Sequence, residues 1–246
     1  MSLSTTPSKT VLITGATSGI GAALFDTYSN KAYKVIACGR DQQQLAAIKN
    51  KAYKICSFDM TNPAEVATKT EAIEQLDIVI LNAGNCRYID NAKQFDAELF
   101  ADVITTNLIS LGWLLQSLLP KIKKGGQVVF VSSSATILPF PRSEAYGASK
   151  AGIDYLAKSL RLDLAINEIS VTLVHPGFIK TPLTDKNDFS MPFLLTSEEA
   201  AQRIFKGVEA HKNYIHFPKR LTLLLKLLAL LPSSLWQSLI VRKHNP

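Results

Sequence analysis

The sequence of 246 residues predicts an α/β fold, a doubly wound parallel sheet with helices on both faces, in a single domain with a C-terminal helical extension. Short apolar runs rich in β-branched residues recur along the chain and alternate with segments of helical spacing, which is typical of parallel sheets with crossover helices. The runs are continuous, as expected for strands buried on both faces. An apolar content of 47% excludes a disordered chain, and the length suits one domain.

Seven apolar runs are the expected strands. In chain order they cover residues 11–13, 35–37, 55–58, 78–81, 128–131, 169–174 and 214–217. The clearest helical segments between them are 95–119 and 144–166. After residue 217 the sequence becomes Leu-rich and basic, and we expect a helical extension that Pro232 interrupts.

The positive charge is concentrated at the C-terminal end of the chain. Lys and Arg number 27 and Asp and Glu 20, a net charge of +7 that suggests nucleic acid or an anionic membrane as a partner. From Lys212 to Pro246 there are six basic and no acidic residues, so residues 1–211 are nearly neutral. The question of a charged partner therefore concerns residues 218–246, which we call the C-terminal tail.

The three cysteines, Cys38, Cys56 and Cys86, are well separated and form no C-x-x-C pair. This usage fits reduced thiols in a cytosolic protein better than a disulfide framework or a metal site. Residues 1–9 are polar and lack the apolar core of a signal peptide, and no stretch has the ~20 apolar residues needed to span a bilayer. We therefore expect a cytoplasmic protein without a metal.

A glycine-rich turn, residues 14–21 (TGATSGIG), follows the first expected strand, and a helix begins at about Gly19. Glycines allow the backbone to approach a phosphate, and a helix start offers unpaired N–H donors at the positive end of the helix dipole. A structural turn is the alternative. The position between the first strand and a helix favours dinucleotide binding.

The end of the second strand bears on which dinucleotide is bound. A carboxylate there would accept ribose hydroxyls and favour NAD, but the chain has Gly39 followed by Arg40. A small residue and a guanidinium suit a 2′-phosphate, so NADP is favoured over NAD. Asp41 is a candidate N-cap of the next helix, and Arg40 as a solvated surface charge is the alternative.

A tyrosine and a lysine are spaced for acid–base chemistry. Tyr146 and Lys150 lie four residues apart on an expected helix and share one face of it. A neighbouring ammonium is expected to lower the pKa of the Tyr146 phenol toward neutrality. Together the two side chains form a candidate general acid–base unit, although this spacing also arises by chance on helix surfaces.

Two further polar features accompany this pair. Residues 132–134 are three serines at the end of the fifth strand, where ligands bind in open α/β sheets, and a hydroxyl there could bond a substrate carbonyl or a turn backbone. Asn107 interrupts an apolar helical stretch. Its buried amide needs hydrogen-bond partners and is expected to bend the helix.

Together these motifs resemble the classical short-chain dehydrogenase/reductase family over about residues 9–217. T-G-x-x-x-G-x-G is matched by residues 14–21, N-N-A-G by 81–84, and P-G-x-x-x-T by 176–181. The resemblance implies a Rossmann fold and places the catalytic tetrad on Asn107, Ser133, Tyr146 and Lys150. It implies cofactor contacts from Gly15, Thr17, Ser18, Gly19, Ile20, Gly21, Arg40, Asp59, Met60, Asn82, Ala83, Gly84, Tyr146, Lys150, Pro176, Gly177, Ile179 and Thr181.

The resemblance also implies a mechanism. Tyr146 would protonate the alkoxide during reduction, while Ser133 would hold the carbonyl oxygen. Lys150 would lower the Tyr146 pKa and hold the ribose hydroxyls of the nicotinamide, and Asn107 would keep a kinked helix and a proton-relaying water. The chain departs from the family pattern at Leu81, which replaces the first Asn of N-N-A-G, and in the short segment 62–75.

The main functional hypothesis is an NADP-dependent oxidoreductase that transfers a hydride to or from a small or medium-sized carbonyl or alcohol substrate. Residues 1–217 would form the dinucleotide-binding and catalytic domain. The apolar residues Phe189, Met191 and Phe193, in the stretch expected to cover the substrate, suggest a lipophilic substrate or simply lid packing. His175 is expected to be structural. The family resemblance implies a homodimer or homotetramer.

The alternative is a non-catalytic NADP-binding module whose C-terminal tail docks a partner or a membrane. Three interpretations of that tail stay open. It could pack on the body or in an oligomer interface, or it could lie peripherally on a membrane with its ten leucines toward lipid. Nucleic-acid binding is disfavoured, because the basic residues are few and embedded among leucines.

Overall fold

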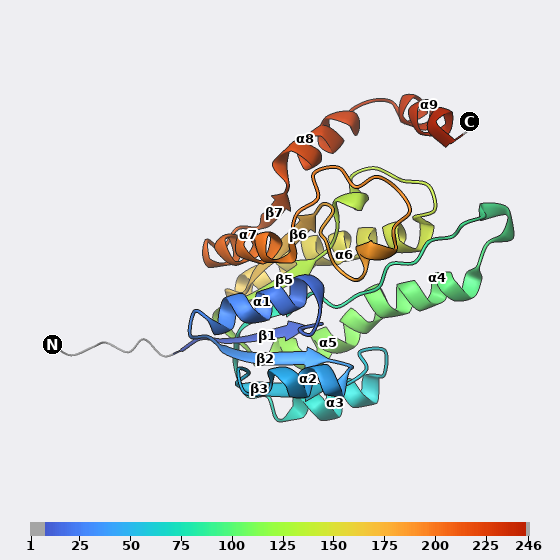
Figure 1. Ribbon diagram of the computed structural model, residues 1–246. Coiled ribbons are helices and arrows are strands. Elements are labelled where there is room, and N and C mark those ends of the chain that lie inside the picture. The colour runs from blue at the N-terminus through green and yellow to red at the C-terminus, as the bar shows by residue number, and fades with distance from the viewer. Residues whose placement is uncertain (1–7, 245–246) are drawn as a thin grey trace.

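Seven strands pair in parallel in the order β3-β2-β1-β4-β5-β6-β7, and helices cover both faces of the sheet (Figure 1). The structure is a computed structural model that describes residues 8–244, with side chains described through residue 241. The predicted doubly wound fold is confirmed. The strands are β1 Thr10–Thr14, β2 Lys34–Gly39, β3 Lys54–Ser57, β4 Leu76–Leu81, β5 Ile122–Val131, β6 Ser170–Pro176 and β7 Tyr214–Phe217.

The chain order reverses between β1 and β4, which lie side by side at the centre of the sheet. In open α/β sheets the crevice outside the carboxyl ends of the strands at such a reversal is where ligands bind. The register brings these ends to one edge, because Thr14 pairs with Cys38, Leu81 with Phe130 and Val131 with Val174. Every predicted site residue follows one of these strand ends or lies on a helix beside them.

The helices connect the strands in the expected alternation. Their bounds are α1 Gly19–Ser29, α2 Gln42–Ile48, α3 Pro63–Glu71, α4 Ala97–Ile104, α5 Ser110–Leu118, α6 Glu144–Asp163, α7 Ser197–Glu209, α8 Lys219–Leu228 and α9 Ser233–His244. Short 3₁₀ turns lie at Ala92–Gln94 (η1), Leu119–Lys121 (η3), Ser134–Thr136 (η4), Leu164–Asn167 (η5) and Thr184–Lys186 (η6), and η2, Thr105–Ile109, is a π-helical turn.

Local sequence explains where several helices begin. The Asp41 carboxylate accepts hydrogen bonds from the backbone N–H groups of Gln43 and Gln44, so its predicted N-cap role on α2 is confirmed. Asn62 caps α3 in the same way, and Pro63 occupies the first helical position, where the missing N–H costs nothing. Thr196 begins α7 with a capping box.

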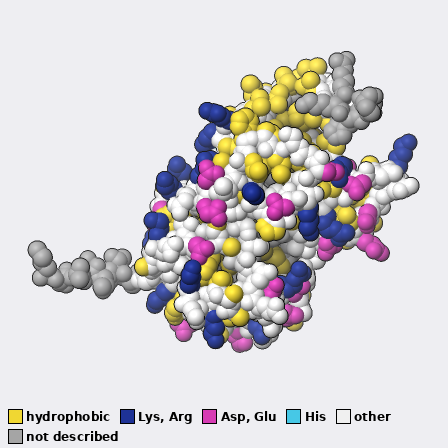
Figure 2. All heavy atoms as spheres, in the orientation of Figure 1, with side chains coloured by type: hydrophobic (Ala, Val, Ile, Leu, Met, Phe, Trp, Pro, Cys, Tyr) yellow, Lys and Arg dark blue, Asp and Glu magenta, His cyan; other side chains and the backbone are white. Residues whose placement is uncertain are grey.

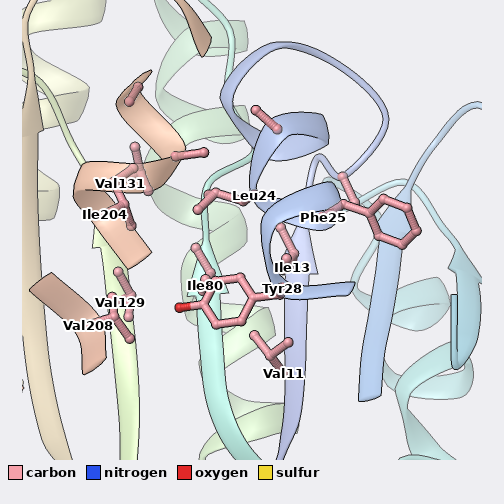
Figure 3. Packing of buried hydrophobic residues seen from close by; sticks show 14 of the residues in the cluster. Val11, Ile13, Leu24, Phe25, Tyr28, Ile80, Val129, Val131, Ile204 and Val208 are labelled. Carbon is pink, nitrogen blue, oxygen red and sulfur yellow. The ribbon is translucent and has the colours of Figure 1, made fainter. Parts of the chain in front are cut away.

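The core has two layers, one on each face of the sheet. On one face α1 and α7 bury Leu24, Tyr28 and Ile204 against Ile13 and Val129 (Figure 3). On the other face, Leu114 of α5 and Ile153 of α6 cover the alternate strand residues, such as Leu12 and Phe130. Successive strand residues point to opposite faces, so both must be apolar. This explains the continuous apolar runs in the sequence.

The predicted helical stretch 95–119 is confirmed, with the predicted interruption at Asn107. It consists of α4, the π-helical turn η2 and α5, and Asn107 lies inside η2. The combined helix Ala97–Lys121 is long and apolar enough to cross a membrane by length and composition alone, which corrects the expectation that no stretch of the sequence is. Its residues Leu111, Leu114 and Leu118 are buried in the sheet core, which accounts for its apolar character.

The C-terminal tail begins with α8, turns at Pro232 as predicted, and continues with α9. Leu221, Thr222 and Leu225 on α8 are buried, and the two leucines belong to a small apolar cluster with Leu138. The indole Nε1 of Trp236 on α9 donates a hydrogen bond to the Pro139 carbonyl oxygen at 2.9 Å. The side chains of Arg242 and Lys243, which the sequence places among the basic residues of the tail, lie outside the described residues.

Candidate active site

The glycine-rich turn between β1 and α1 forms a cradle at the reversal point of the sheet. Gly15 and Gly19 have φ values of +66° and +51°, which favour glycine. A Cβ at Gly21 would collide with the carbonyl oxygen of Gly15. Ser18 makes no side-chain cap to α1, whose first turn contains no acidic residue. The backbone donors at the start of α1 are therefore available to an anion such as a pyrophosphate, and the residues fit that group.

The segment after β4 forms the floor of this cradle. The Thr14 hydroxyl accepts hydrogen bonds from the backbone N–H groups of Asn82 at 2.9 Å and Ala83 at 3.0 Å. The Asn82 side-chain amide donates to the Thr14 carbonyl at 3.0 Å. A Cβ placed on Gly84 would lie 2.9 Å from Asn107 Oδ1 and 3.6 Å from Lys150 Nζ. The floor therefore joins the glycine-rich turn to the residues of the predicted tetrad.

Arg40 and Asp59 meet at the end of β2 and β3, where an adenosine would lie. Their closest side-chain atoms are 3.7 Å apart, and the Arg40 side chain is largely exposed. The Thr61 backbone N–H and hydroxyl donate to the Asp59 carboxylate, and they hold its pKa below the ordinary value together with Arg40. Met60 packs, partly buried, against the core.

The tetrad residues come together from three elements. Tyr146 and Lys150 lie on α6, and the Lys150 ammonium is 5.7 Å from the centre of the Tyr146 ring. The ammonium donates a hydrogen bond to the Val131 carbonyl at 3.0 Å, which fixes it at the end of β5. Ser133, two residues after the end of β5, interacts with the Tyr146 phenol and also accepts from the Ala135 backbone N–H. The geometry brings an acid, an ammonium and a hydroxyl to one edge of the sheet.

Asn107 is buried and connects the loop after β4 to α6. Its amide oxygen accepts from the Asn85 backbone N–H at 2.8 Å, and its amide nitrogen donates to the Asn85 carbonyl at 2.9 Å. The same nitrogen donates to the Ser149 hydroxyl at 3.0 Å. These bonds satisfy the side chain, so its visible role is to hold the loop and the helix together.

Burial controls the protonation of the tetrad. It raises the pKa of the Tyr146 phenol above its ordinary value, the Cys86 thiol raises it further, and the Ser133 hydrogen bond opposes both. Burial also lowers the pKa of Lys150 to about 8. The predicted lowering of the Tyr146 pKa by Lys150 is therefore wrong for this state. The physical reason is that both groups are desolvated and the ammonium bonds Val131 rather than the phenol.

His175 lies below the tetrad in a buried hydrogen-bonded chain. Its Nε2 is 2.9 Å from the Asp154 carboxylate, and its Nδ1 is 3.0 Å from the Tyr214 hydroxyl. Burial raises the pKa of Asp154, but the interaction with His175 and the hydrogen bonds of Ser132 and Thr136 outweigh this and leave it below the ordinary value. The partners agree with the structural role predicted for His175. Asp154, one helical turn after Lys150, was not singled out in the sequence.

The substrate side contains residues that the motifs do not reveal. Tyr88 donates a hydrogen bond from its hydroxyl to Asn187 at 3.0 Å, and its ring contacts Phe189 edge to face. Arg142 pairs with Asp188 at 2.8 Å, and also with Asp90. These contacts join residues 183–194, called the lid because this stretch is expected to cover the substrate, to Tyr88 and Arg142. The sequence signals for them were the position of 85–88 directly after the N-A-G motif and the aromatic residue Phe189 in the expected lid.

The segment Pro176–Thr181 connects β6 to this lid. Ile179 is buried and bridges to Leu195 as an isolated β-bridge, and the Thr181 side chain touches the position where a Cβ on Gly19 would lie. A Cβ on Gly177 would come within 2.8 Å of Leu221 on α8. The segment that is expected to border the nicotinamide is therefore packed between the glycine-rich turn and the C-terminal tail.

Comparison with known proteins identifies the family. A family model described as short chain dehydrogenase matches residues 9–191. An uncharacterized oxidoreductase of Myxococcus xanthus is 32% identical over 242 residues, and the match covers 94% of this chain and 95% of that protein. These matches extend over the cradle and the whole tetrad.

Two solved structures share the fold. A short chain dehydrogenase from Burkholderia cenocepacia J2315 in complex with NADP has a TM-score of 0.81 at 21% identity, covering 97% of this chain and 98% of that one. A short chain dehydrogenase/reductase from Burkholderia phymatum in complex with NAD has a TM-score of 0.79 at 21% identity, covering 89% and 92%. The family model and the relative in Myxococcus together show that this chain belongs to the short-chain dehydrogenase/reductase family of oxidoreductases.

Proposed function

We propose that the protein is an NADP-dependent oxidoreductase that interconverts a lipophilic carbonyl compound and its alcohol. The observation that carries this proposal is the convergence of Ser133, Tyr146 and Lys150 beside the glycine-rich cradle. A non-catalytic NADP-binding module has no need of a buried ammonium one helical turn from a phenol. The tetrad therefore favours an enzyme.

The chain's own residues supply position and proton transfer. When bound in the cradle, NADPH supplies the hydride. Ser133 holds the carbonyl oxygen of the substrate, and Tyr146 donates its phenolic proton to that oxygen as negative charge develops. Lys150 replaces the proton on Tyr146, which its pKa of about 8 permits near neutral pH. Asn107 keeps the loop after β4 against α6, so that these groups stay in register.

The preference for NADP over NAD is supported by three residues at the end of β2, Gly39, Arg40 and Asp41. Gly39 leaves no carboxylate at the position that would bind ribose hydroxyls, and the Asp41 carboxylate is occupied as the cap of α2. Arg40 is exposed and held near the site only by a 3.7 Å pairing with Asp59. Its guanidinium can therefore turn to a 2′-phosphate with little loss.

A lipophilic substrate is supported by the lid. Phe189 and Phe193 remain partly exposed after packing, and Phe189 also contacts Phe178 at the end of β6. Lid packing alone therefore leaves apolar surface at the mouth of the site. Such surface fits an apolar substrate body.

We further propose a homodimer or homotetramer formed through α5 and α6. Helix α6 exposes the large apolar side chains Tyr155 and Leu162, and the short turns next to these helices expose Ile109 in η2 and Ile166 in η5. Exposed apolar patches of this kind mark association surfaces.

The buried Cys38 and Cys56 are free thiols, which fits a cytoplasmic protein.

The proposal is tested by an NADPH-oxidation screen against ketones, aldehydes, steroids and acyl carbonyls, repeated with NADH. The expected result is turnover of an apolar carbonyl compound with NADPH that the Tyr146→Phe variant lacks. Tight NADPH binding without turnover of any carbonyl class, in a protein whose Tyr146→Phe variant behaves the same, would establish the non-catalytic module instead.

A further inference from the structure

Helix α8 is apolar on two opposite sides, and the body of the protein covers only one of them. Leu221 and Leu225 are buried against Leu138, with Phe178 packed alongside. A helix on the surface of a soluble domain needs a single apolar stripe to hold it in place. This inner stripe is complete, so packing on the body does not account for the remaining leucines.

The outer stripe of α8 points to solvent. Leu223 and Leu227, four residues apart on one side of α8, are 56% and 63% exposed, and Leu230, in the turn just after the helix, is 81% exposed. Leu224 and Leu231 flank them and are also exposed. Figure 2 shows hydrophobic side chains gathered at the end of the molecule where α8 lies in Figure 1. Single exposed leucines need no explanation, but a continuous group of them marks an interaction surface.

Helix α9 extends this surface. It exposes Leu235 and Leu239, one helical turn apart, and its axis turns by 117° from that of α8. Trp236 fixes it to the body through its hydrogen bond to Pro139 and an edge-to-face contact with the Phe140 ring. The exposed leucines thus lie on two helices that are bent relative to each other, and the second helix is held to the body by Trp236.

The charged residues of the tail itself have one sign. Lys219 and Arg220 are exposed at the start of α8, one turn before Leu223 and Leu224 on the same side. The sequence contains no Asp or Glu from Lys212 to Pro246. Apolar side chains bordered by cations are complementary to a bilayer surface with anionic headgroups.

We propose that the outer face of α8 and α9 docks on the surface of an anionic membrane, with its leucines among the acyl chains and Lys219 and Arg220 at the headgroups. The ten residues of α8 would extend only about 15 Å, half the thickness of the hydrocarbon core, so the contact is peripheral and does not cross the bilayer. This inference goes beyond the proposed reaction and does not depend on it.

A second copy of the chain is the competing occupant, and charge disfavours it. A two-fold interface brings the same patch of both subunits together. Here both copies of the patch are cationic, and the sequence of the tail has no acidic side chain to pair with Lys219 or Arg220 of the other copy. Like charges opposed in this way weaken an interface, whereas anionic lipid neutralises them.

The test is sedimentation of the full-length protein with sucrose-loaded vesicles. One set contains phosphatidylcholine alone and the other equal parts of phosphatidylcholine and phosphatidylglycerol. The test variant carries Leu223→Gln, Leu227→Gln and Leu230→Gln. The matched control carries Tyr53→Gln and Phe95→Gln, which remove apolar side chains that are 62% and 48% exposed, outside the tail and outside the helices proposed for oligomerisation. Far-UV circular dichroism verifies the folding of each variant.

The expected result is binding of the full-length protein and the control to the anionic vesicles, with affinity more than ~10-fold lower for the leucine variant. Lys219→Gln and Arg220→Gln should each weaken binding about fivefold, and phosphatidylcholine alone should bind less. The proposal is overturned if the full-length protein sediments with neither vesicle, or if the leucine variant binds as well as the control. It is also overturned if that variant only converts a dimer to monomers without affecting vesicle binding.

Discussion

The carboxyl edge of the sheet buries polar groups, whereas the C-terminal tail exposes apolar groups to water. At the sheet edge, Asn107, Lys150 and His175 are polar or charged groups that are buried, and each has hydrogen-bond partners from another element. In the tail, Leu223 and Leu227 are apolar groups left in water. The polar groups of the sheet edge find their partners within the chain, whereas the leucines of the tail leave water only when a partner covers them. Substitutions should therefore affect turnover and folding at the edge, and association at the tail.

The largest effect is expected from Tyr146→Phe. Loss of the phenolic proton should lower kcat by about 10²–10⁴-fold, because no other hydroxyl can donate to the alkoxide from that position. NADPH affinity, measured by fluorescence titration, should change less than threefold, since the ring stays in place. Turnover near the native rate would show that Tyr146 is not the proton donor.

The next effect concerns the buried pair below the tetrad. Asp154→Ala removes the carboxylate that is hydrogen-bonded to the buried His175 and should lower the free energy of unfolding by about 1–3 kcal/mol. Urea denaturation followed by circular dichroism measures this. The control is Asp102→Ala, which breaks the exposed 3.3 Å pair with Arg87 and should cost less than about 1 kcal/mol. Equal losses in the two variants would remove the contrast between buried and exposed groups.

Arg40→Ala tests the cofactor end of the sheet edge. Loss of a guanidinium bound to a 2′-phosphate should raise the KM for NADPH about 10–100-fold. The KM for NADH is the internal control and should change little, because NADH has no 2′-phosphate. A parallel rise for both cofactors would assign Arg40 to general positioning of the adenosine.

The pH profile of reduction tests the protonation of Lys150. Its pKa is lowered to about 8 by burial, so the ammonium loses its proton as the pH rises through that value. Below pH 8 it can replace the proton on Tyr146, and above pH 8 kcat/KM for reduction should fall by up to about tenfold per pH unit. A profile that stays flat to pH 10 would exclude Lys150 as the proton source.

The smallest effect is expected in the tail. Leu230→Ala removes a side chain that packs on nothing buried, so the free energy of unfolding should change by less than about 0.5 kcal/mol. Leu225→Ala on the inner side of α8 should cost about 2–5 kcal/mol. Thermal denaturation of the two variants measures the difference. Similar losses would show that the turn at Leu230 is also buried in solution.

Most of the sheet and the positions of the tetrad could be predicted from the sequence, because each depends on a local pattern. Continuous apolar runs mark strands buried on both faces, and glycine spacing marks the turn before α1. The spacing of Tyr146 and Lys150 marks a shared helix face. Each of these patterns lies within a short stretch of chain, so it can be recognised without knowledge of the fold.

The remaining features depend on contacts between distant segments. Tyr88 and Asn187 are 99 residues apart, and their hydrogen bond follows from the path of the lid. The pKa of Lys150 follows from how deeply α6 is buried, which the sequence does not state. The ten leucines of the tail were visible from the start, but only the structure shows which of them face the body.

The close packing of Gly177 against Leu221 and Pro218 makes the start of the tail part of the wall of the site. Gly177 also donates its backbone N–H to the Phe217 carbonyl at 2.7 Å, which holds the end of β6 against β7. A chain shortened after β7 would uncover this wall and leave Phe178 and Leu138 exposed. Removal of the tail by proteolysis or deletion should therefore disturb the site as well. The outer face of α8 can change by substitution of single side chains, because the inner face of the same helix is packed against the body.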